Sequence, residues 1–257
     1  MWNKELSIAG HAAEAAGKTL TRMFGKVTNI RRKSDIDLVT EADIQAEKII
    51  LDTIHRYFPQ DNLLSEEAGR HDEGSDRTWV IDPLDGTTNF AHGFPFFAIS
   101  IALQIREEIV LGVVYNPYLD EYFEAAQNMG ATLNKKPIRV SKTPSLGEAL
   151  LATGFPYTIH EEPQAVMHLL EKLVTRVQGV RRSGSAAIDL CYVAAARLDG
   201  FWEQELKPWD TAAGSIIVKE AGGNVSTFQG EPFSPYLTSI TASNPLIHNA
   251  IIRVLNG

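Results

Sequence analysis

The stretch TWVIDPLDGTTNF, from Thr78 to Phe90, ends a short apolar run with two aspartates, Asp82 and Asp85, that lie three positions apart. The apolar run is typical of a buried β-strand, and Pro83 would end its hydrogen-bonding ladder and turn the chain. Such a turn lets both carboxylates and the backbone carbonyl of Leu84 face one point instead of alternating across a sheet. Oxygen ligands of this kind are those that Mg²⁺ and similar hard cations prefer. The stretch therefore indicates a cation site at a strand end.

The residues that follow suit an anion. Gly86 allows close approach to the backbone, and Thr87 offers a hydroxyl and an N–H group where a helix or turn begins. Asp, Pro and Gly are also the commonest turn-forming residues, so this stretch alone is equally consistent with an ordinary turn. Other parts of the chain have to decide between the two interpretations.

Two further stretches place carboxylates where a site could use them. LLSEEAG, from Leu63 to Gly69, has adjacent glutamates at what we expect to be another strand end. KPWDTAAG, from Lys207 to Gly214, places Asp210 where we expect the N-cap of a helix. Taken separately, a glutamate pair is usually a solvated surface, and an N-cap aspartate usually only satisfies backbone N–H groups. Neither stretch is diagnostic by itself.

The composition narrows the class of protein. The 257 residues carry a formal net charge of −8, and 44% of them are apolar, which is ordinary for a globular chain. An acidic chain is a poor ligand for nucleic acids or anionic membranes, which are bound through clustered Lys and Arg. No basic-then-apolar secretory signal opens the sequence, and no apolar run approaches the 18 residues of a membrane span. With one cysteine, Cys191, we expect a small buried side chain, no disulfide and a cytoplasmic location.

Hydrophobic periodicity predicts two helices near the start of the chain. Small and apolar residues recur at helical spacing between positions 6 and 24. Thr40 and Asp43 have the spacing of a capping box, so a second helix should begin there. Its expected apolar face is formed by Ile44, Leu51, Ile54 and Phe58.

Beyond position 59 the pattern changes to short strands without intervening helices, which favours an antiparallel sheet. From about position 141, candidate strands at 149–155 and 200–204 alternate with candidate helices at 164–177, 185–198 and 211–223. We therefore expect an α+β half over residues 1–140, with paired helices and an antiparallel sheet, packed tightly against an α/β half over residues 141–257.

Jointly, the motifs match one known family in the right order. The sequence resembles the inositol monophosphatase family of Mg²⁺-dependent, lithium-sensitive sugar-phosphate phosphatases. The resemblance is carried by DLVTEAD (37–43), SEE (65–67), WVIDPLDGTTNF (79–90), RRSGSAAIDLC (181–191), PWDTAAG (208–214) and EAGG (220–223). These motifs are spread over nearly the whole chain.

The resemblance implies a layered αβαβα sandwich, with an antiparallel sheet half, a mixed-sheet α/β half and a metal site at their junction. It implies up to three Mg²⁺ ions per site, Mn²⁺ as a substitute, inhibition by Li⁺, and a homodimer acting on a small phosphate ester. Matched residue by residue, the metal ligands would be Glu66, Asp82, Asp85, Asp210 and the carbonyl of Leu84. The catalytic residues would be Asp43 and Thr87, which orient the attacking water, together with Glu66. The substrate contacts would be Asp85, Gly86, Thr87, Ser185, Ala186, Glu203 and Asp210.

Other mechanisms fit the residues less well. Thr87 lacks a neighbouring base in sequence that could activate it as a covalent nucleophile. The seven histidines show no paired zinc-binding spacing such as HExxH. The family also has a mobile loop that carries a basic residue over the metal site, and here either Arg32 or Lys33 corresponds to it.

The sequence therefore predicts a Mg²⁺-dependent phosphomonoesterase that hydrolyses inositol monophosphate and related polyol or sugar monophosphates. Fructose-1,6-bisphosphatase, nucleotide phosphatase and histidinol-phosphate phosphatase activities remain open on the same scaffold. An alternative of another class is a regulatory binding module in a transcription or ribosome assembly complex. The concentration of carboxylates argues against a scaffold without activity, because unpaired charges in a folded protein are costly.

Overall fold

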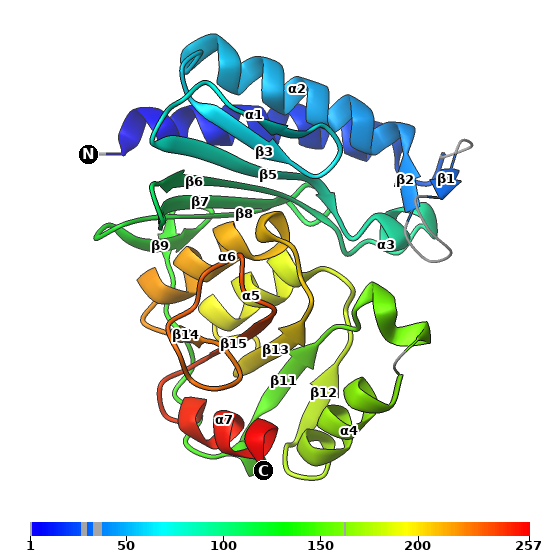
Figure 1. The fold of residues 1–257 in the computed structure, drawn as a ribbon, viewed down its shortest axis with the longest axis vertical. Helices are drawn as coiled ribbons and strands as arrows, with labels where there is room; N and C mark the ends of the chain where they lie inside the picture. Colours follow the sequence, from blue (N-terminus) through cyan, green and yellow to red (C-terminus); the bar gives the residue numbers. More distant parts are fainter. Residues whose placement is uncertain (1, 27–29, 33–37, 162) are drawn as a thin grey trace.

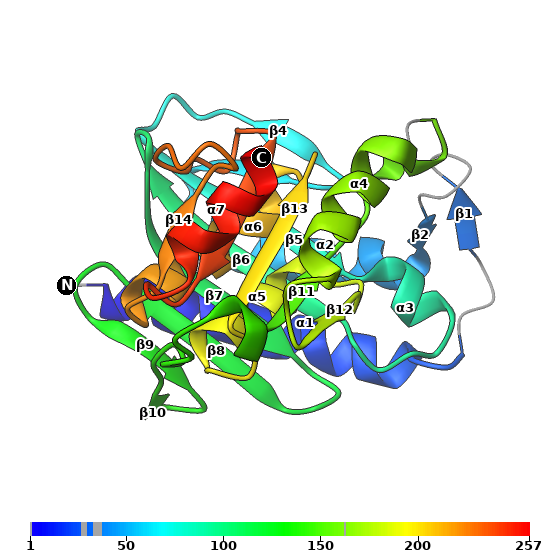
Figure 2. The ribbon, with the colours of Figure 1, turned by 90° about the horizontal axis from the view of Figure 1, so that it is seen from below.

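The computed structural model describes residues 2–26, 30–32, 38–161 and 163–257. Five layers are stacked in the order helices, sheet, helices, sheet, helices (Figure 1). The outer helices over the first sheet are α1 (Asn3–Met23) and α2 (Glu41–Tyr57), and the middle layer holds α5 (Ala186–Ala194) and α6 (Pro208–Glu220). On the far face of the second sheet lie α4 (Pro163–Val174) and α7 (His248–Asn256), as Figure 2 shows. The αβαβα sandwich implied by the resemblance is confirmed.

The first helical layer packs through small residues. The capping box of α2 is confirmed: Thr40 Oγ1 accepts a hydrogen bond from Ala42 N at 3.1 Å, and Thr40 N donates to Asp43 Oδ2 at 2.8 Å. The predicted apolar face of α2 is partly wrong, because Ile44 is 42% exposed. The fully buried stripe is instead Ala42, Ala46, Ile50 and Ile54. Small side chains at four-residue spacing let α2 approach the alanine-rich α1, which turns Ile44 to solvent.

The first sheet has eight strands in the order β10-β9-β8-β7-β6-β5-β3-β4. They are β3 (Asn62–Ser65), β4 (Gly69–His71), β5 (Arg77–Asp85), β6 (Ala98–Ile105), β7 (Glu108–Asn116), β8 (Glu121–Ala126), β9 (Gly130–Leu133) and β10 (Lys136–Pro137). Adjacent strands are antiparallel as predicted, except that β3 runs parallel to β5. The exception arises because β4 first returns along β3, so the chain enters β5 in the direction of β3.

The second sheet is mixed, as predicted, with the order β12-β11-β13-β15-β14. It consists of β11 (Leu150–Thr153), β12 (Gly179–Arg181), β13 (Gly200–Gln204), β14 (Asn224–Ser226) and β15 (Ser239–Ser243). β11 is parallel to β12 and to β13, whereas β15 is antiparallel to β13 and β14. Helical crossovers through α4 and α5 permit the parallel pairs.

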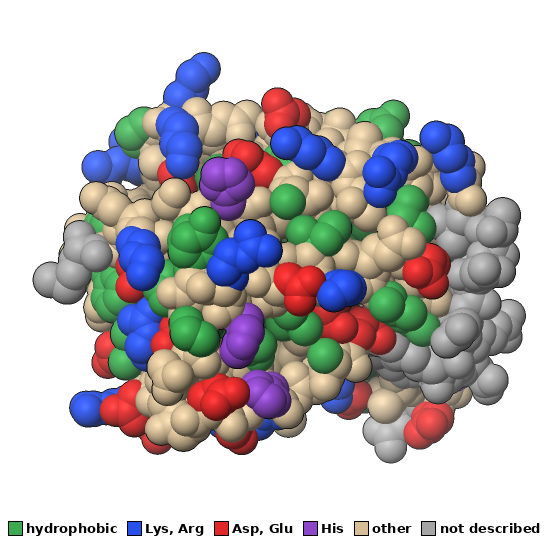
Figure 3. Space-filling model, turned by 90° about the horizontal axis from the view of Figure 1, so that it is seen from above, with side chains coloured by type: hydrophobic (Ala, Val, Ile, Leu, Met, Phe, Trp, Pro, Cys, Tyr) green, Lys and Arg blue, Asp and Glu red, His purple; other side chains and the backbone are tan. Residues whose placement is uncertain are grey.

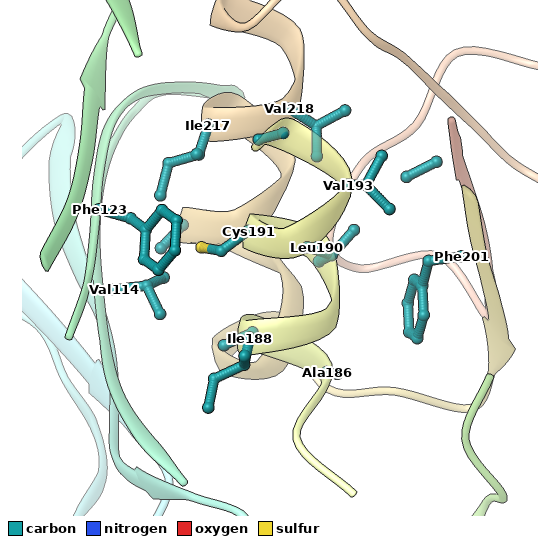
Figure 4. Packing of buried hydrophobic residues seen from close by; sticks show 14 of the residues in the cluster. Val114, Phe123, Ala186, Ile188, Leu190, Cys191, Val193, Phe201, Ile217 and Val218 are labelled. Carbon is teal, nitrogen blue, oxygen red and sulfur yellow. The ribbon is translucent and has the colours of Figure 1, made fainter. Parts of the chain in front are cut away.

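The middle helices join the two sheets into one packed body. Figure 4 shows α5 with Cys191 directed towards Phe123 of the first sheet and Phe201 of β13 on its other side. Cys191 is a free, buried thiol, which agrees with its interpretation as a small core side chain. The predicted division at residues 140 and 141 falls between β10 of the first sheet and β11 of the second, and the assignment of the two halves as tightly packed domains stays a prediction.

The short elements complete the fold. β1 (Ile30–Arg32) and β2 (Leu38–Thr40) form a small antiparallel pair, and α3 (Thr87–Ala91) follows β5. Single turns of 3₁₀-helix span Leu146–Glu148 and Tyr157–His160. On the face formed by α1 and α2, acidic and basic side chains are interspersed (Figure 3). None of the helices in the described ranges is long and apolar enough to cross a membrane.

Candidate functional site

A cavity of about 300 Å³ lies where the first sheet meets the middle helices. Its wall includes the end of β5, the start of α3, the start of α5 and the start of α6. All the residues that the sequence assigned to metal or substrate line it together: Glu66, Asp82, Leu84, Asp85, Gly86, Thr87, Ser185, Ala186, Glu203 and Asp210. Residues more than 140 positions apart in sequence are thus gathered at one place.

A β-bulge explains how β5 presents two aspartates to the same cavity. The strand does not end at Pro83, as the sequence suggested, but continues to Asp85 with a register shift against β6. Asp82 lies opposite Ser100 and Asp85 opposite Ala98, so β5 carries one extra residue over this segment. In a regular strand, residues three apart would face opposite sides, and the extra residue restores a common side. Leu84 N donates to Asp82 Oδ1 at 2.9 Å within the bulge.

Gly86 is required where β5 passes into α3. Its φ of +92° lies in the left-handed region, which side chains other than glycine rarely adopt. A Cβ atom at this position would lie 3.0 Å from the carbonyl oxygen of Phe96 and 3.2 Å from that of Gly184. The backbone of β5 can therefore approach the loop before α5 only because position 86 is glycine.

Asp43 reaches the site from α2, although it does not line the cavity itself. Thr87 Oγ1 lies 2.9 Å from Asp43 Oδ1 and 2.9 Å from the carbonyl oxygen of Leu84, and both atoms can accept its proton. The other carboxylate oxygen, Oδ2, accepts from the hydroxyl of Thr40 at 2.6 Å. Burial raises the pKa of Asp43 to about 6, against the hydrogen bonds from Thr40 and Thr87, which lower it. The predicted pairing of Asp43 with Thr87 is thus present as a contact.

The turn that carries Glu66 is held by a residue that the sequence analysis missed. Glu47 on α2 is 7% exposed, and its Oε1 accepts hydrogen bonds from the Ser65 hydroxyl, from Glu67 N at 3.1 Å and from Ala68 N at 2.9 Å. A glutamate within a helical pattern gives no signal of such a role, because the partners lie some 20 positions away. The turn after β3 is thereby fixed to α2.

Asp210 is not the N-cap that the sequence predicted. α6 begins at Pro208, and Asp210 is its third residue, whose Oδ2 accepts from Lys207 N at 2.7 Å. The helix begins earlier because proline is well tolerated at its first position, where no N–H donor is needed. The carboxylate still lies in the first turn of α6 and lines the cavity.

The carboxylates influence one another. Burial raises the pKa of Asp82 well above its ordinary value, and nearby Glu66, Asp85 and Asp210 add to the rise. Burial likewise raises the pKa of Asp210 well above its ordinary value, and Asp85 and Glu66 contribute. The pKa of Asp85 rises to about 6 through burial, although hydrogen bonds from Ser185 and Ala187 oppose the rise. The cavity therefore disfavours negative charge as it stands.

The fit of this site to a cation rests on its donors. All the acidic residues expected as ligands offer hard oxygen atoms, and the electrostatic coupling places them close together. Among the described residues, no three Asp, Glu, His or Cys side chains form a closed metal-binding cluster in this conformation. The donor set fits a hard divalent cation, and binding would require the carboxylates to move closer together.

The substrate end of the cavity contains Ser185, Ala186 and Glu203. Ser185 caps α5, since its hydroxyl accepts from Ile188 N at 3.3 Å and donates to Asp85 Oδ2 at 2.6 Å. Glu203 on β13 is 8% exposed, and a Cβ atom added to Gly154 would lie 2.0 Å from Glu203 Oε1. Burial first, then Asp210 and Asp189, raise the pKa of Glu203 well above its ordinary value.

Further residues line the cavity without having been predicted as site residues, and the charged ones among them are Arg182, Asp189, Glu205 and Lys207. Asp189 occupies a position in an apolar helix pattern and could have been noticed as an unexpected charge. The basic residue sought at Arg32 or Lys33 is not settled: Lys33 lies outside the described residues, as does the side chain of Arg32.

Comparison with known proteins places this geometry in a family. The model of the inositol monophosphatase family matches residues 2–256. An inositol-1-monophosphatase of Synechocystis sp. is 48% identical over 97% of this chain and 88% of its own length. A fructose-1,6-bisphosphatase/inositol-1-monophosphatase of Aquifex aeolicus is 41% identical over 98% of this chain and 95% of its own length. The Nus factor SuhB of Escherichia coli is 42% identical over 96% of this chain and 94% of its own.

Solved structures agree with the sequence comparison. The structure of an inositol monophosphatase from Anabaena (Nostoc) sp. superposes with a TM-score of 0.90 at 42% identity, covering 99% of this chain and 96% of the other. The match extends over both sheets and all the layers that form the cavity. On the family model, the relatives and the shared fold, this chain belongs to the inositol monophosphatase family.

Proposed function

We propose that this phosphomonoesterase hydrolyses the monophosphates of inositol and related polyols in a reaction that requires Mg²⁺. The observation that carries the proposal is the gathering of Glu66, Asp82, Asp85 and Asp210 in one cavity that also contains Glu203. Metal-dependent phosphate chemistry needs the first four, and recognition of hydroxyl groups needs the fifth. The name of the Synechocystis relative supports the same substrate class.

Glu66, Asp82, Asp85, Asp210 and the carbonyl of Leu84 would hold the metal. Their mutual repulsion in a partly buried cavity raises their pKa values, and divalent cations would offset that repulsion. Bound Mg²⁺ would lower the pKa of a water molecule and neutralise phosphoryl oxygens, which is the main requirement in phosphate ester hydrolysis. The family resemblance suggests up to three ions per site, with Mn²⁺ as a substitute.

Asp43 and Thr87 would orient the nucleophile. The hydroxyl of Thr87 can donate to Asp43 Oδ1, which leaves a lone pair of Thr87 Oγ1 to accept a hydrogen bond from water. Asp43, with a pKa of about 6, can take up a proton near neutral pH. The pair therefore supplies an acceptor at a fixed place beside the carbonyl of Leu84, and Glu66 lines the same cavity.

The backbone at Gly86 and Thr87 would hold the phosphate group. N–H groups in the first turn of a helix have no partners within that helix, so those of α3 suit phosphoryl oxygens. Asn89 fixes this segment, because its Nδ2 donates to the carbonyl oxygens of Phe96 at 2.7 Å and Ser183 at 2.9 Å. Asp85, Ser185, Ala186, Glu203 and Asp210 would contact the rest of the substrate.

Fructose-1,6-bisphosphatase activity is the second candidate. Arg182 and Lys207 also line the cavity, and a second phosphate group would suit their positive charge. The Aquifex aeolicus relative, which carries both activities in its name, points the same way. The buried Glu203 and Asp189 oppose it, because carboxylates repel a second phosphate unless a cation intervenes.

The relatives named Nus factor SuhB keep open a regulatory role of the chain in a transcription or ribosome assembly complex. The complete set of carboxylates favours an enzyme, since a binding scaffold would gain nothing from their repulsion. A homodimer in the cytoplasm is our expectation from the family resemblance, and sedimentation equilibrium would test the dimer.

A panel of phosphate esters assayed with purified protein tests the proposal. We expect hydrolysis of inositol 1-phosphate with Mg²⁺ or Mn²⁺, loss of activity in EDTA and inhibition by Li⁺. Full turnover in excess EDTA would contradict the metal mechanism. A clear preference for fructose 1,6-bisphosphate would favour the second candidate, and inactivity on every ester would favour the regulatory role.

A further inference from the structure

One buried carboxylate oxygen in the cavity has no hydrogen-bond partner. Among the buried side chains that the structure describes, three N or O atoms are left without a partner: Asn116 Nδ2, Asp189 Oδ1 and Thr241 Oγ1. Of these residues only Asp189 lines the cavity. Its side chain is 2% exposed and belongs to the first turns of α5, four residues after the N-cap Ser185.

A carboxylate oxygen in this position is costly unless something binds it. Burying a polar atom without a hydrogen bond is unfavourable, and a buried charge is more so. Burial raises the pKa of Asp189 well above its ordinary value, with the Ser183 hydroxyl acting in the opposite direction. A purely structural role would be served better by an apolar side chain, because the neighbours of Asp189 on α5 are core residues such as Ile188 and Leu190.

Asp189 and Glu203 lie close together at the same end of the cavity. The charge of Asp189 contributes to the raised pKa of Glu203, and Arg182 lowers the pKa of both carboxyl groups. All three residues line the cavity. The carboxylate of Glu203 packs directly against Gly154, where a side chain at position 154 would collide with it, and Gly154 lines the same end of the cavity. The arrangement is therefore two carboxyl groups with one guanidinium beside them.

This chemistry selects hydroxyl groups. A carboxylate accepts hydrogen bonds from alcohols, and two neighbouring carboxyl groups suit two hydroxyls of one polyol. We propose that Asp189 is a second hydroxyl-binding residue beside Glu203, so that the site reads two hydroxyl groups of its polyol phosphate. The inference rests on the proposed function and adds a residue that determines specificity within it.

The test compares two esters and two variants at Asp189. For Asp189→Ala we expect kcat/KM for inositol 1-phosphate to fall 10- to 100-fold, because a site that hydrogen-bonds a hydroxyl depends on its partner. Hydrolysis of p-nitrophenyl phosphate, whose leaving group has no alcohol hydroxyl, should change less than threefold. Asp189→Asn keeps one acceptor oxygen in a side chain of the same shape, so its loss of kcat/KM for inositol 1-phosphate should be smaller than that of Asp189→Ala.

A second readout isolates hydroxyl binding from phosphate chemistry. Free inositol should inhibit p-nitrophenyl phosphate hydrolysis by the wild type, and Asp189→Ala should raise the inhibition constant at least fivefold. Cys191→Ala is the matched control, since it alters α5 two residues further on in the packed core and should leave both esters and the inhibition constant unchanged (Figure 4).

The outcomes separate the inference from the function on which it rests. Suppose that the wild type hydrolyses inositol 1-phosphate, and that Asp189→Ala lowers kcat/KM for both esters equally or for neither. Asp189 then does not bind hydroxyl groups, and only the inference fails. If the wild type hydrolyses no polyol phosphate, the proposed function fails and the inference fails with it.

Discussion

Asp85 Oδ2 accepts a hydrogen bond of 2.6 Å from the hydroxyl of Ser185, which lies 100 positions further along the chain. The same oxygen accepts from Ala187 N at 2.7 Å, so the carboxylate at the end of β5 also satisfies the first turn of α5. A group expected to bind a cation thus holds together the two parts of the chain that form the cavity. Substitutions of Asp85 should therefore affect cation binding and the stability of the fold by different amounts.

We expect Asp85→Asn to lower kcat/KM by at least 100-fold while the protein stays folded. The amide keeps an acceptor for Ser185 but removes the negative charge that a cation requires. The folded pKa of Asp85 is about 6 against an ordinary value of 3.8, so ionisation costs stability as pH rises from about 4 through 6. In EDTA at pH 7.5 the variant should therefore melt at the same temperature as the wild type or higher.

Thermal melting with and without Mg²⁺ measures both parts of this prediction. Mg²⁺ should raise the melting temperature of the wild type, because a ligand of the folded state stabilises it, and should have much less effect on Asp85→Asn. Ser215→Ala is the control: its hydroxyl bonds only within α6, to the carbonyl of Ala212. A marked fall in the melting temperature of Asp85→Asn in EDTA would mean that Asp85 serves mainly as a cap.

Glu47→Gln should weaken Mg²⁺ binding, although Glu47 does not line the cavity. Glu47 holds the turn of Ser65, Glu67 and Ala68 through charge-assisted hydrogen bonds, each of which contributes about 1.5–3 kcal/mol. With a neutral amide, the turn that carries Glu66 should be less well fixed. Mutation of a residue that orients a metal ligand typically lowers metal affinity about 10- to 100-fold. The Mg²⁺ concentration for half-maximal activity should therefore rise by about the same factor.

Glu41→Gln is the matched control for Glu47, because Glu41 lies on the exposed side of the same helix and contacts only Gln45 among the hydrogen bonds described. Both variants should bind p-nitrophenyl phosphate with a similar KM at saturating Mg²⁺. An unchanged Mg²⁺ requirement in Glu47→Gln would show that the turn is fixed by other contacts.

The sequence predicted the architecture well where a signal is local. The capping box at Thr40 and the alternation of strands and helices after residue 141 depend on neighbours in the chain, and both are present in the structure. The course of β5 could not be predicted in the same way. Pro83 indicates a strand end, but the bulge between Asp82 and Asp85 depends on pairing with β6, which lies elsewhere in the sequence.

The site was predictable as far as motifs carried it. The motifs identified six residues that all line one cavity: Glu66, Asp82, Asp85, Thr87, Glu203 and Asp210. Their roles remain predictions. Glu47 was missed because a glutamate is ordinary in its helix, and Asp189 is an unexpected charge in an apolar helix whose role the sequence does not indicate. Their significance comes from partners, or the lack of one, that only the tertiary structure provides.

His248 should make the protein less stable in mild acid. It is 4% exposed at the start of α7, with Nε2 2.9 Å from the Ser226 hydroxyl and Nδ1 2.9 Å from that of Ser243. Burial lowers its pKa below the ordinary 6.5, so below about pH 7 the unfolded chain binds a proton that the folded protein does not. The stability that the neutral ring provides is present above pH 6.5 and is lost as pH falls towards the folded pKa.

Urea unfolding between pH 5 and 8 measures this effect, at about 1.4 kcal/mol for each unit by which the pKa is lowered. His248→Gln, which cannot take up a proton, should flatten the dependence of the unfolding free energy on pH. His11→Gln, at an exposed position on α1, should leave the slope as it is. Parallel slopes for wild type and His248→Gln would show that the acid sensitivity lies in other groups.

Glu203 should bind the hydroxyl groups of the substrate and not its phosphate group. It lies on β13, is 8% exposed and lines the cavity, and its carboxylate packs against Gly154, where no Cβ atom obstructs it. Glu203→Gln replaces one acceptor oxygen with an amide donor, so a hydroxyl that donates to that oxygen loses its partner and a buried group is left unpaired. We expect kcat/KM for inositol 1-phosphate to fall at least tenfold while that for p-nitrophenyl phosphate is nearly unchanged. Equal losses on the two esters would assign Glu203 to support of the neighbouring Asp210 and not to the substrate.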